Sequence, residues 1–366
     1  MAIDGNSVLL LVNIAPPGEP FDYEAVGEQR GLTESSSRDA IDASHKLRDH
    51  MVNLLGRADG TVSLEGLWVP DDIALQAIER AYREKQVVIL RKQVQGIAVE
   101  QREGVITTFD KDYPDNDVST ITVEIALNDF AVTLKAPDDV LGLVGWYEAQ
   151  SLVEDGAEDL DPIETWPDMS DAENDLVQAI GGNQPILRTG TLNQRAILRF
   201  TTNNFMTTDF GLGNEVLEAT AFVVYQVTDY EQERQNILDG ITEDDRMQIA
   251  LNEPDVEGNV RLEMRASELN RLTYPKVAPF PQFVIQTAVF SGTTSEFREN
   301  RSLKRTGDVG DNQLTGLTVG ANWDGSDDHL EGDIAEIILY DRRIREGDRA
   351  SIEVYLSNKY ALELGL

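Results

Sequence analysis

Carboxylates on strands are the first residues of this sequence that could do chemistry. Retaining glycoside hydrolysis needs two of them about 5 Å apart, which alternate residues of one strand provide. In NVRLEMRASE (residues 259–268) Glu263 stands alone, and in GDIAEIILYD (residues 332–341) Asp333 and Glu336 are three residues apart. That spacing places the two acids on opposite faces of a regular strand. We therefore expect no catalytic residues and no enzyme.

Two loops are rich in oxygen atoms that a hard cation prefers. They are EDGAEDLDP (residues 154–162) and NWDGSDDHLEGD (residues 322–333). In the second loop Asp324, Asp327 and Asp328 could converge on calcium, with Gly325 allowing the turn. No EF-hand spacing is present, and a solvated acidic turn is the alternative. No other cofactor is expected.

The same loop offers the best candidate for glycan binding. Trp323 could act as an aromatic platform, with Asn322 and Asp324 beside it as hydrogen-bonding groups. The alternative is a tryptophan buried at the edge of a core, which is the commoner place for this residue. The sequence leaves both open.

Several other chemistries are excluded by composition. The chain has no cysteine, which rules out disulfides, thiolate catalysis and cysteine-ligated zinc. Its three histidines, His45, His50 and His329, stand in no metal or triad motif. No run of about 20 apolar residues is present, so we expect no membrane insertion. The apolar stretch VLLLVNI (residues 8–14) follows an acidic residue and indicates a buried strand, not a signal peptide.

The formal net charge is −35. Up to Lys135 there are 23 acidic and 13 basic residues, a balance of −10, and the rest of the chain carries −25. Such a chain repels phosphate backbones, so specific binding of nucleic acid is not expected. One interpretation is a soluble or salt-adapted surface. The other is a surface that lets DNA pass without adhering to it.

The first 137 residues show the pattern of an antiparallel sheet with one helix. Apolar residues alternate in GTVSLEGLWV (residues 60–69) and STITVEIALN (residues 119–128), which indicates strands with one wet face. Residues 71–86 change to helical spacing, and acidic residues at their start suit a helix N-terminus. The predicted fold is an antiparallel β barrel or sandwich carrying this helix.

A polar, serine-rich segment interrupts that pattern. GEQRGLTESSSRDAIDASHK (residues 27–46) has no clear periodicity and follows the proline-rich turn APPGEP. Irregular segments of this length are unusual inside compact domains. It is either a flexible surface loop or an arm that reaches another subunit.

Residues 138–366 show the pattern of a second domain. Short apolar strands, among them AILRF, ATAFVVYQV, QFVIQTAVF and AEIILYD, are separated by clusters of Gly, Asn, Asp and Pro. This pattern is typical of a β sandwich. A helical segment near residues 345–362 follows the last strand.

This second part resembles concanavalin A-like, laminin-G-type jelly-roll domains over about Val140 to Leu366. Residues 332–362 are similar to the end of those domains, where a late strand runs into a short helix. GWYEAQSL, TWPDMSDAENDLVQA and LNQRAILRF match earlier pieces in the same order. The resemblance implies a lectin-like jelly roll, in which Trp166 and Pro167 plug one end of the sandwich and Asp168 turns the chain. Relatives carry Ser-Gly-x-Gly-Asn where this sequence has SDAEND, so we expect the loop of residues 169–175 to differ in conformation.

The first part resembles the major tail tube proteins of long-tailed, siphovirus-like phages over about Ala2 to Ala136. The polar segment, the strand GTVSLEGLWV, the helix of residues 71–86 and VSTITVEIALN agree with that family in order and spacing. The resemblance implies hexameric rings stacked into a hollow tube.

Together these patterns predict a structural virion protein located in the phage tail and assembled in the host cytoplasm. Its expected partners are copies of itself, other tail proteins, DNA that passes through the lumen, and glycans of the host surface. A gene transfer agent would use a similar tube. The alternatives are a carbohydrate-binding adhesin and a glycoside hydrolase.

Overall fold

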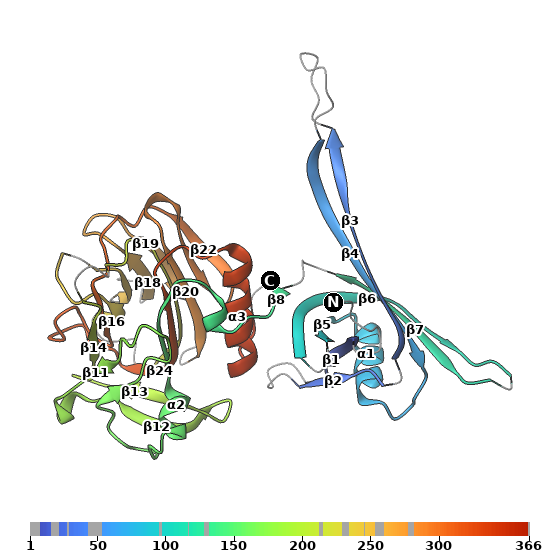
Figure 1. The fold of residues 1–366 in the computed structure, drawn as a ribbon, viewed down its shortest axis with the longest axis horizontal. Coiled ribbons are helices and arrows are strands. Elements are labelled where there is room, and N and C mark those ends of the chain that lie inside the picture. The colour runs from blue at the N-terminus through green and yellow to red at the C-terminus, as the bar shows by residue number, and fades with distance from the viewer. Residues whose placement is uncertain are drawn as a thin grey trace, which may run out of the picture. The chain divides into compact units, whose positions relative to one another are not determined.

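The computed structural model describes residues 8–15, 22–27, 29–42, 53–94, 97–115, 117–127, 132–211, 215–228, 234–244, 246–252, 260–276 and 282–364. The chain divides into two compact units, Met1–Leu134 and Lys135–Leu366 (Figure 1). The expected mainly-β class is confirmed, because both units consist largely of antiparallel strands. Among the helices of these described residues, none is long and apolar enough to cross a membrane.

The first unit is an antiparallel sheet with the helix α1 on one face. The strands run in the order β2-β1-β5-β6-β7-β4-β3, and β8 pairs with β6. The bounds are β1 Val8–Asn13, β2 Tyr23–Ala25, β3 Gln29–Asp42, β4 Asn53–Leu67, α1 Ile73–Glu84, β5 Val87–Val94, β6 Ile97–Asp112, β7 Thr120–Leu127 and β8 Val132–Thr133.

The core of the first unit lies between α1 and the sheet. The alternating apolar residues of β4 and β7 are buried there with one face of the helix: Val62, Leu64, Ile121, Val123 and Ile125 against Ala74, Leu75, Ile78 and Ala81. The Asp72 carboxylate caps α1 by accepting a hydrogen bond from the Leu75 N–H at 2.8 Å. The helix ends at Lys85, whose φ of 57° is left-handed. The predicted helix and its acidic start are therefore present.

The sheet of the first unit is strongly curved. The Gln29 side chain bonds to both backbone groups of Leu10, donating through Nε2 at 2.8 Å and accepting through Oε1 at 3.0 Å. Glu34 on β3 lies 3.3 Å from both Lys92 on β5 and Arg102 on β6. Because β3 is several strands away from β1, β5 and β6 in the sheet order, these contacts require the sheet to curl like a barrel.

The segment that the sequence offered as a surface loop is largely an edge strand. Residues 29–42 form β3, which pairs with β4 from Gln29↔Gly66 to Asp42↔Asn53. Leu32 of β3 packs against the core. The rest of this segment, including His45, lies outside the described residues, as does His50. Cross-strand pairing makes this polar segment extended, without the apolar alternation that marks a half-buried strand.

The second unit is a sandwich of two antiparallel sheets. Sheet B has the order β12-β13-β24-β15-β20-β21-β22, with β9 paired to β24, and sheet C has the order β10-β11-β14-β23-β16-β17-β18-β19. The strands of sheet B are β9 Leu143–Glu148, β12 Ile186–Leu192, β13 Arg195–Phe200, β15 Ala219–Val227, β20 Val284–Phe290, β21 Ser295–Glu299, β22 Ser302–Gly307 and β24 Gly332–Tyr340. Those of sheet C are β10 Thr165–Trp166, β11 Leu176–Val177, β14 Met206–Asp209, β16 Gln235–Asp239, β17 Gln248–Asn252, β18 Val260–Arg265, β19 Leu272–Lys276 and β23 Gly316–Val319.

Helices are few in this unit. They are α2 Ala149–Glu154 and α3 Glu346–Tyr360, together with the short 3-10 turns η2 Pro137–Asp139, η3 Gly181–Asn183 and η4 Gly292–Thr294. The strand, turn and helix expected near the end of the chain are therefore found as β24 and α3.

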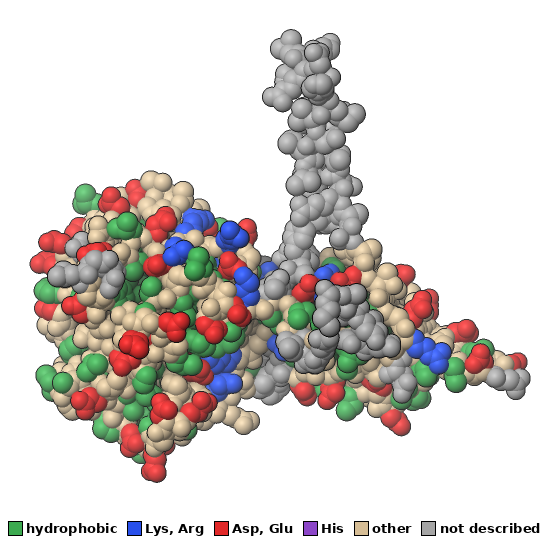
Figure 2. Space-filling model, viewed as in Figure 1, with side chains coloured by type: hydrophobic (Ala, Val, Ile, Leu, Met, Phe, Trp, Pro, Cys, Tyr) green, Lys and Arg blue, Asp and Glu red, His purple; other side chains and the backbone are tan. Residues whose placement is uncertain are grey.

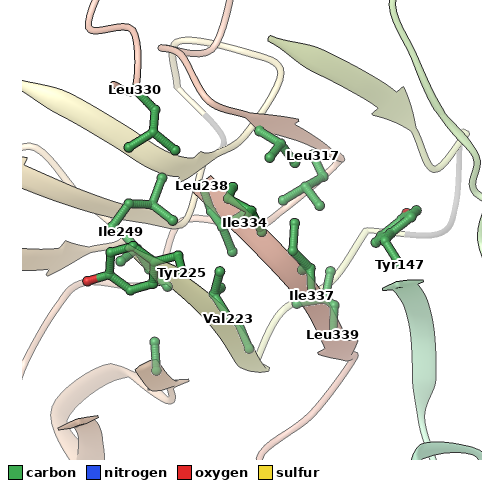
Figure 3. Close-up of a cluster of buried hydrophobic side chains, with 14 of the residues drawn as sticks. Tyr147, Val223, Tyr225, Leu238, Ile249, Leu317, Leu330, Ile334, Ile337 and Leu339 are labelled. Carbon is green, nitrogen blue, oxygen red and sulfur yellow. The ribbon is translucent and has the colours of Figure 1, made fainter. Parts of the chain in front are cut away.

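Apolar side chains pack on both faces of sheet B. Toward sheet C, Val223, Ile334 and Ile337 meet residues such as Leu238 and Ile249 in the main core (Figure 3). On the other face α3 covers a second cluster, which includes Phe222, Ile338, Tyr340, Ile352, Leu356 and Tyr360. Sheet B is thus buried on both sides, as its nearly continuous apolar strands require.

Trp166 and Asp168 anchor the end of β10 and the loop that follows it. Trp166 is fully buried in the main core, 5.9 Å from the Tyr147 ring. The Asp168 carboxylate accepts hydrogen bonds from the N–H groups of Trp146, Ser170 and Asn174 and from the Ser170 hydroxyl. In the same loop Glu173 has a φ of 55°, a left-handed conformation that glycine adopts at less cost. Glu173 therefore adopts a left-handed conformation that the glycine of the relatives would adopt more easily.

Asp168→Ala is expected to lower the free energy of unfolding of the second unit by about 3 kcal/mol, because three buried or half-buried N–H groups lose their acceptor. Urea unfolding followed by tryptophan fluorescence measures this change. Asp171→Ala, an exposed carboxylate of the same loop, serves as the control and should stay within about 0.5 kcal/mol. Equal stabilities of the two variants would contradict the role given to Asp168.

Candidate functional site

The β3–β4 hairpin is the first candidate surface. It extends far beyond the pair Ser35↔Thr61, whereas the core contacts of these strands lie before that point, at Leu32, Val62 and Leu64. Figure 1 shows the two strands leaving the rest of the sheet as an arm. An isolated two-stranded ribbon is marginally stable in water. The arm and the edge strand β3 are therefore suited to pairing with another chain.

The face of the sheet opposite α1 is the second candidate surface, and we call it the polar face. It is formed by side chains that alternate with the core residues of β3, β4, β6 and β7. Its members are Thr33, Ser35, Thr61, Ser63, Glu65, Thr108, Asp110, Asp112, Thr120, Thr122 and Glu124. Within these stretches the described side chains on this face carry hydroxyls and carboxylates and include no lysine or arginine.

Local hydrogen bonds order the polar face. The hydroxyls of Ser35 and Thr61 lie 2.6 Å apart across the strands, and the Thr108 hydroxyl donates to the Glu124 carboxylate at 2.9 Å. The nearby cation Lys111 points to the other side of the sheet. It pairs with Glu79 on α1 at 2.9 Å and lies 3.6 Å from the Trp68 ring centroid. The hydrogen bond from Lys111 lowers the pKa of the Glu79 carboxyl.

In the second unit, residues 322–328 form a tight, self-bonded turn. The Asn322 side-chain oxygen accepts from the N–H groups of Ser326 and Asp327. The Asp324 carboxylate accepts from the Ser326 hydroxyl at 2.6 Å and from its N–H, and the first of these bonds chiefly lowers the Asp324 pKa. Gly325 has a φ of 71°, and an added Cβ would lie only 2.3 Å from the Phe205 ring. Only glycine fits there.

The three predicted calcium ligands are not brought together by this turn. Asp324 is engaged with Ser326, whereas the Asp328 carboxylate lies 3.5 Å from Arg234. Burial raises the Asp328 pKa, and Arg234 opposes that effect. Asp327 accepts from the N–H of Asp328. Across the described ranges, no three His, Asp or Glu side chains are arranged to hold a metal ion. The calcium site remains a prediction without support from the geometry.

Trp323 is neither buried in a core nor fully exposed, since its accessibility is intermediate. Its backbone oxygen accepts a hydrogen bond from the Thr318 hydroxyl at 3.3 Å. The indole ring takes no part in this hydrogen bond. Asn322 is also partly exposed, and Asp324 is exposed. The three residues predicted to contact a glycan therefore share one solvent-facing turn.

The expectation that Asp333 and Glu336 face opposite sides of their strand is wrong. The pairing of β15 with β24 shifts between Val224 and Tyr225, which places a bulge in β24. As a result Ile334 and Ile337 both point into the main core, although they are three residues apart. The two acids accordingly share the outer face of sheet B, because a bulge reverses the alternation of a strand.

Each of these carboxylates is held by cations or hydroxyls of the fold. Asp333 accepts two hydrogen bonds from Arg199, at 2.7 and 2.9 Å. Glu336 lies 2.7 Å from Lys359 and accepts from the Tyr360 hydroxyl at 2.7 Å. Burial raises the pKa of Glu336, and Lys359 opposes this shift. These bonds tie neighbouring elements together and occupy the oxygen atoms that a hydrolase would need.

Glu263 is surrounded by arginines that the sequence pattern did not reveal. Its carboxylate lies 2.9 Å from Arg234 and 3.3 Å from Arg271, and Arg265 is 3.7 Å away. Nearby Asp239 is fully buried, and burial raises its pKa to about 6. Arg265 shares β18 with Glu263, whereas Arg234 and Asp239 come from segments well before that strand, so local spacing alone could not have predicted the cluster.

Comparison with known proteins gives a family for the first unit. Residues 2–129 match the family described as phage tail tube protein. The match covers about a third of the chain. It identifies a tail tube domain in the first unit and locates the protein in the virion tail. No curated protein matches the chain.

Several solved structures resemble part of the chain. The tail of an empty gene transfer agent particle with C6 symmetry is 15% identical, with a TM-score of 0.32, and covers 37% of this chain and 100% of its own. The SPP1 tail tube is 10% identical, with a TM-score of 0.32, and covers 36% and 78%. Domain 4 of an arabinanase from Geobacillus stearothermophilus, in complex with arabinotriose, is 15% identical, with a TM-score of 0.39, and covers 58% and 98%. TM-scores below 0.5 carry no conclusion about function.

Proposed function

We propose that this protein is the subunit of a phage tail tube, in which copies assemble as hexameric rings that stack into a hollow cylinder. The single observation that carries the proposal is the β3–β4 hairpin, whose strands continue well past the core of their own unit. The family match of residues 2–129 supports the same assignment. Strand pairing between copies would use the free edge of β3 and would remove an edge that otherwise invites aggregation.

The polar face is the part of the sheet suited to line the lumen. The opposite face is covered by α1 and is therefore closed to a passing molecule. Glu65, Asp110, Asp112 and Glu124 give the polar face negative charge. DNA carries closely spaced negative charges and is repelled by such a wall within about a Debye length, roughly 10 Å at 0.1 M salt.

The second unit serves as an outward decoration of the tube. Residues 136–366 carry −25 of the net charge, and Figure 2 shows acidic side chains spread over the visible surface of this unit. Close packing of such units in a wall would be unfavourable at low ionic strength. The turn at Asn322, Trp323 and Asp324 is the surface on which a host glycan would bind. The tube would belong to a long-tailed phage or a gene transfer agent and would contact other tail proteins at its ends.

An adhesin without a tube is the second candidate, favoured by the solvent-facing position of Trp323. A persistent monomer at high concentration would support it, whereas rings or tubes in electron micrographs support the tail tube. A glycoside hydrolase has no such observation in its favour, because Asp333, Glu336 and Glu263 are engaged by basic side chains.

Shortening the arm is expected to abolish tubes while leaving the subunit folded. Residues 36–60 would be replaced by an Asn-Gly turn, which joins the strands at the pair Ser35↔Thr61 and keeps Leu32 and Val62 in the core. Negative-stain electron microscopy and sedimentation measure assembly, and circular dichroism checks the fold. A control variant shortens the tip of the β6–β7 hairpin, residues 113–118, in the same way. Tubes of normal length from the arm variant would overturn the proposal.

Reversing charge on the polar face is expected to make tubes retain DNA. In Glu65→Lys with Glu124→Lys, purified tubes should bind short duplex DNA at about 20 mM salt and release it above about 0.3 M, because the new attraction is screened. Binding is measured by co-sedimentation of labelled DNA. Glu84→Lys, which changes an exposed residue of α1 on the opposite side of the sheet, is the control. Equal retention by both variants would contradict a luminal polar face.

Trp323→Ala is expected to weaken adsorption to host cells with a stability cost of about 1 kcal/mol, since the side chain is only partly buried. Trp166→Ala, in the same unit but fully buried, should cost about 3 kcal/mol or more. Melting curves and an adsorption assay separate the two effects. Unchanged adsorption of the Trp323 variant would remove the glycan site.

A further inference from the structure

The first residues of the second unit are bound by its last helix. The segment of residues 135–140, here called the leading segment, begins where the first unit ends: the Leu134 N–H still bonds to Val99 in the first unit at 3.0 Å. The next N–H, that of Lys135, donates to the Ser351 hydroxyl of α3 at 2.7 Å. No residue of the described chain is left between these two anchors.

Three further contacts hold the leading segment. The Lys135 ammonium pairs with Asp348 in the first turn of α3. The backbone oxygen of Pro137 accepts from the Tyr340 hydroxyl at 3.0 Å, at the end of β24. Val140 is 4% exposed and packs in the same cluster as Tyr340 and Ile352 of α3. The segment is thus fixed by hydrogen bonds, an ion pair and apolar packing.

The helix α3 is itself fixed at one register by buried polar contacts. Its Lys359 ammonium lies 2.7 Å from both Glu148 and Glu336, and its Glu353 accepts from the Thr287 hydroxyl at 2.9 Å. Buried charges tolerate little displacement, because each loses its partner when the helix slides or rotates. Ser351 and Asp348 are therefore presented to the leading segment in one orientation.

We propose that α3 acts as a clasp that closes the second unit on its own first residues and keeps the tether between the two units at its shortest. Without the clasp, residues 135–139 would become additional free chain. The inference is independent of tube assembly, since the contacts between α3 and the leading segment lie within the second unit.

The test is limited trypsin digestion of the full chain, read by mass spectrometry as cleavage between Lys135 and Ala136. The clasp variant combines Ser351→Ala and Asp348→Asn. The matched control combines Ser357→Ala, whose hydroxyl bonds to Leu362 at the far end of α3, with Glu346→Gln, an exposed carboxylate of its first turn. The clasp variant should be cut at Lys135 at least tenfold faster than wild type, and the control at the wild-type rate.

Hydrogen exchange supplies a second readout. The peptide containing residues 134–140 should exchange faster in the clasp variant, while peptides of β15 and β20 keep wild-type protection. If the double variant unfolds the whole unit, Asp348→Asn alone is compared with the control in the same two measurements. This single change removes only a partly exposed ion pair. Equal cleavage and exchange in clasp and control variants, or rapid cleavage of wild type at Lys135, would overturn the proposal.

Discussion

The need to cover apolar sheet faces determines the architecture of both units. Sheet B is apolar on both sides, so one face requires sheet C and the other requires α3. The sheet of the first unit is apolar on one side only, and the single face of α1 is enough to cover it. What remains exposed in the first unit is a broad polar sheet surface and an edge strand. These leftover surfaces are the ones available for assembly.

Because α3 covers one face of sheet B, the charged side chains between the helix and the sheet are buried. Helix α3 presents Glu353 and Lys359 toward the sheet, and Glu336 of β24 faces the helix from the other side. Charges in such a place are weak evidence for stability, since desolvation offsets most of their attraction. Their contribution is to permit one position of α3 on the sheet and to disfavour positions in which the helix is shifted along its axis.

The sequence predicts elements whose cause is local. Strand β7 and helix α1 were predicted because apolar residues recur at the spacing of a strand and a helix that each bury one face. The upper part of the arm was missed, since polar residues such as Ser36 are extended there by pairing with β4 and not by burial. The bulge in β24 was missed too, because every residue of this strand is buried and an extra residue leaves no break in its pattern. Arg234 reaches Glu263 from a segment 29 residues away, and this contact forms only in the fold.

Both ends of the second unit converge on one cluster. Val140 near its start and Leu362 near its end belong to the apolar group under α3. A domain whose ends lie close together can be joined to another chain, or inserted into one, without reorganising its own core. Recombination could thus exchange the second unit without disturbing the first, because this cluster shares no residue with the core between α1 and its sheet.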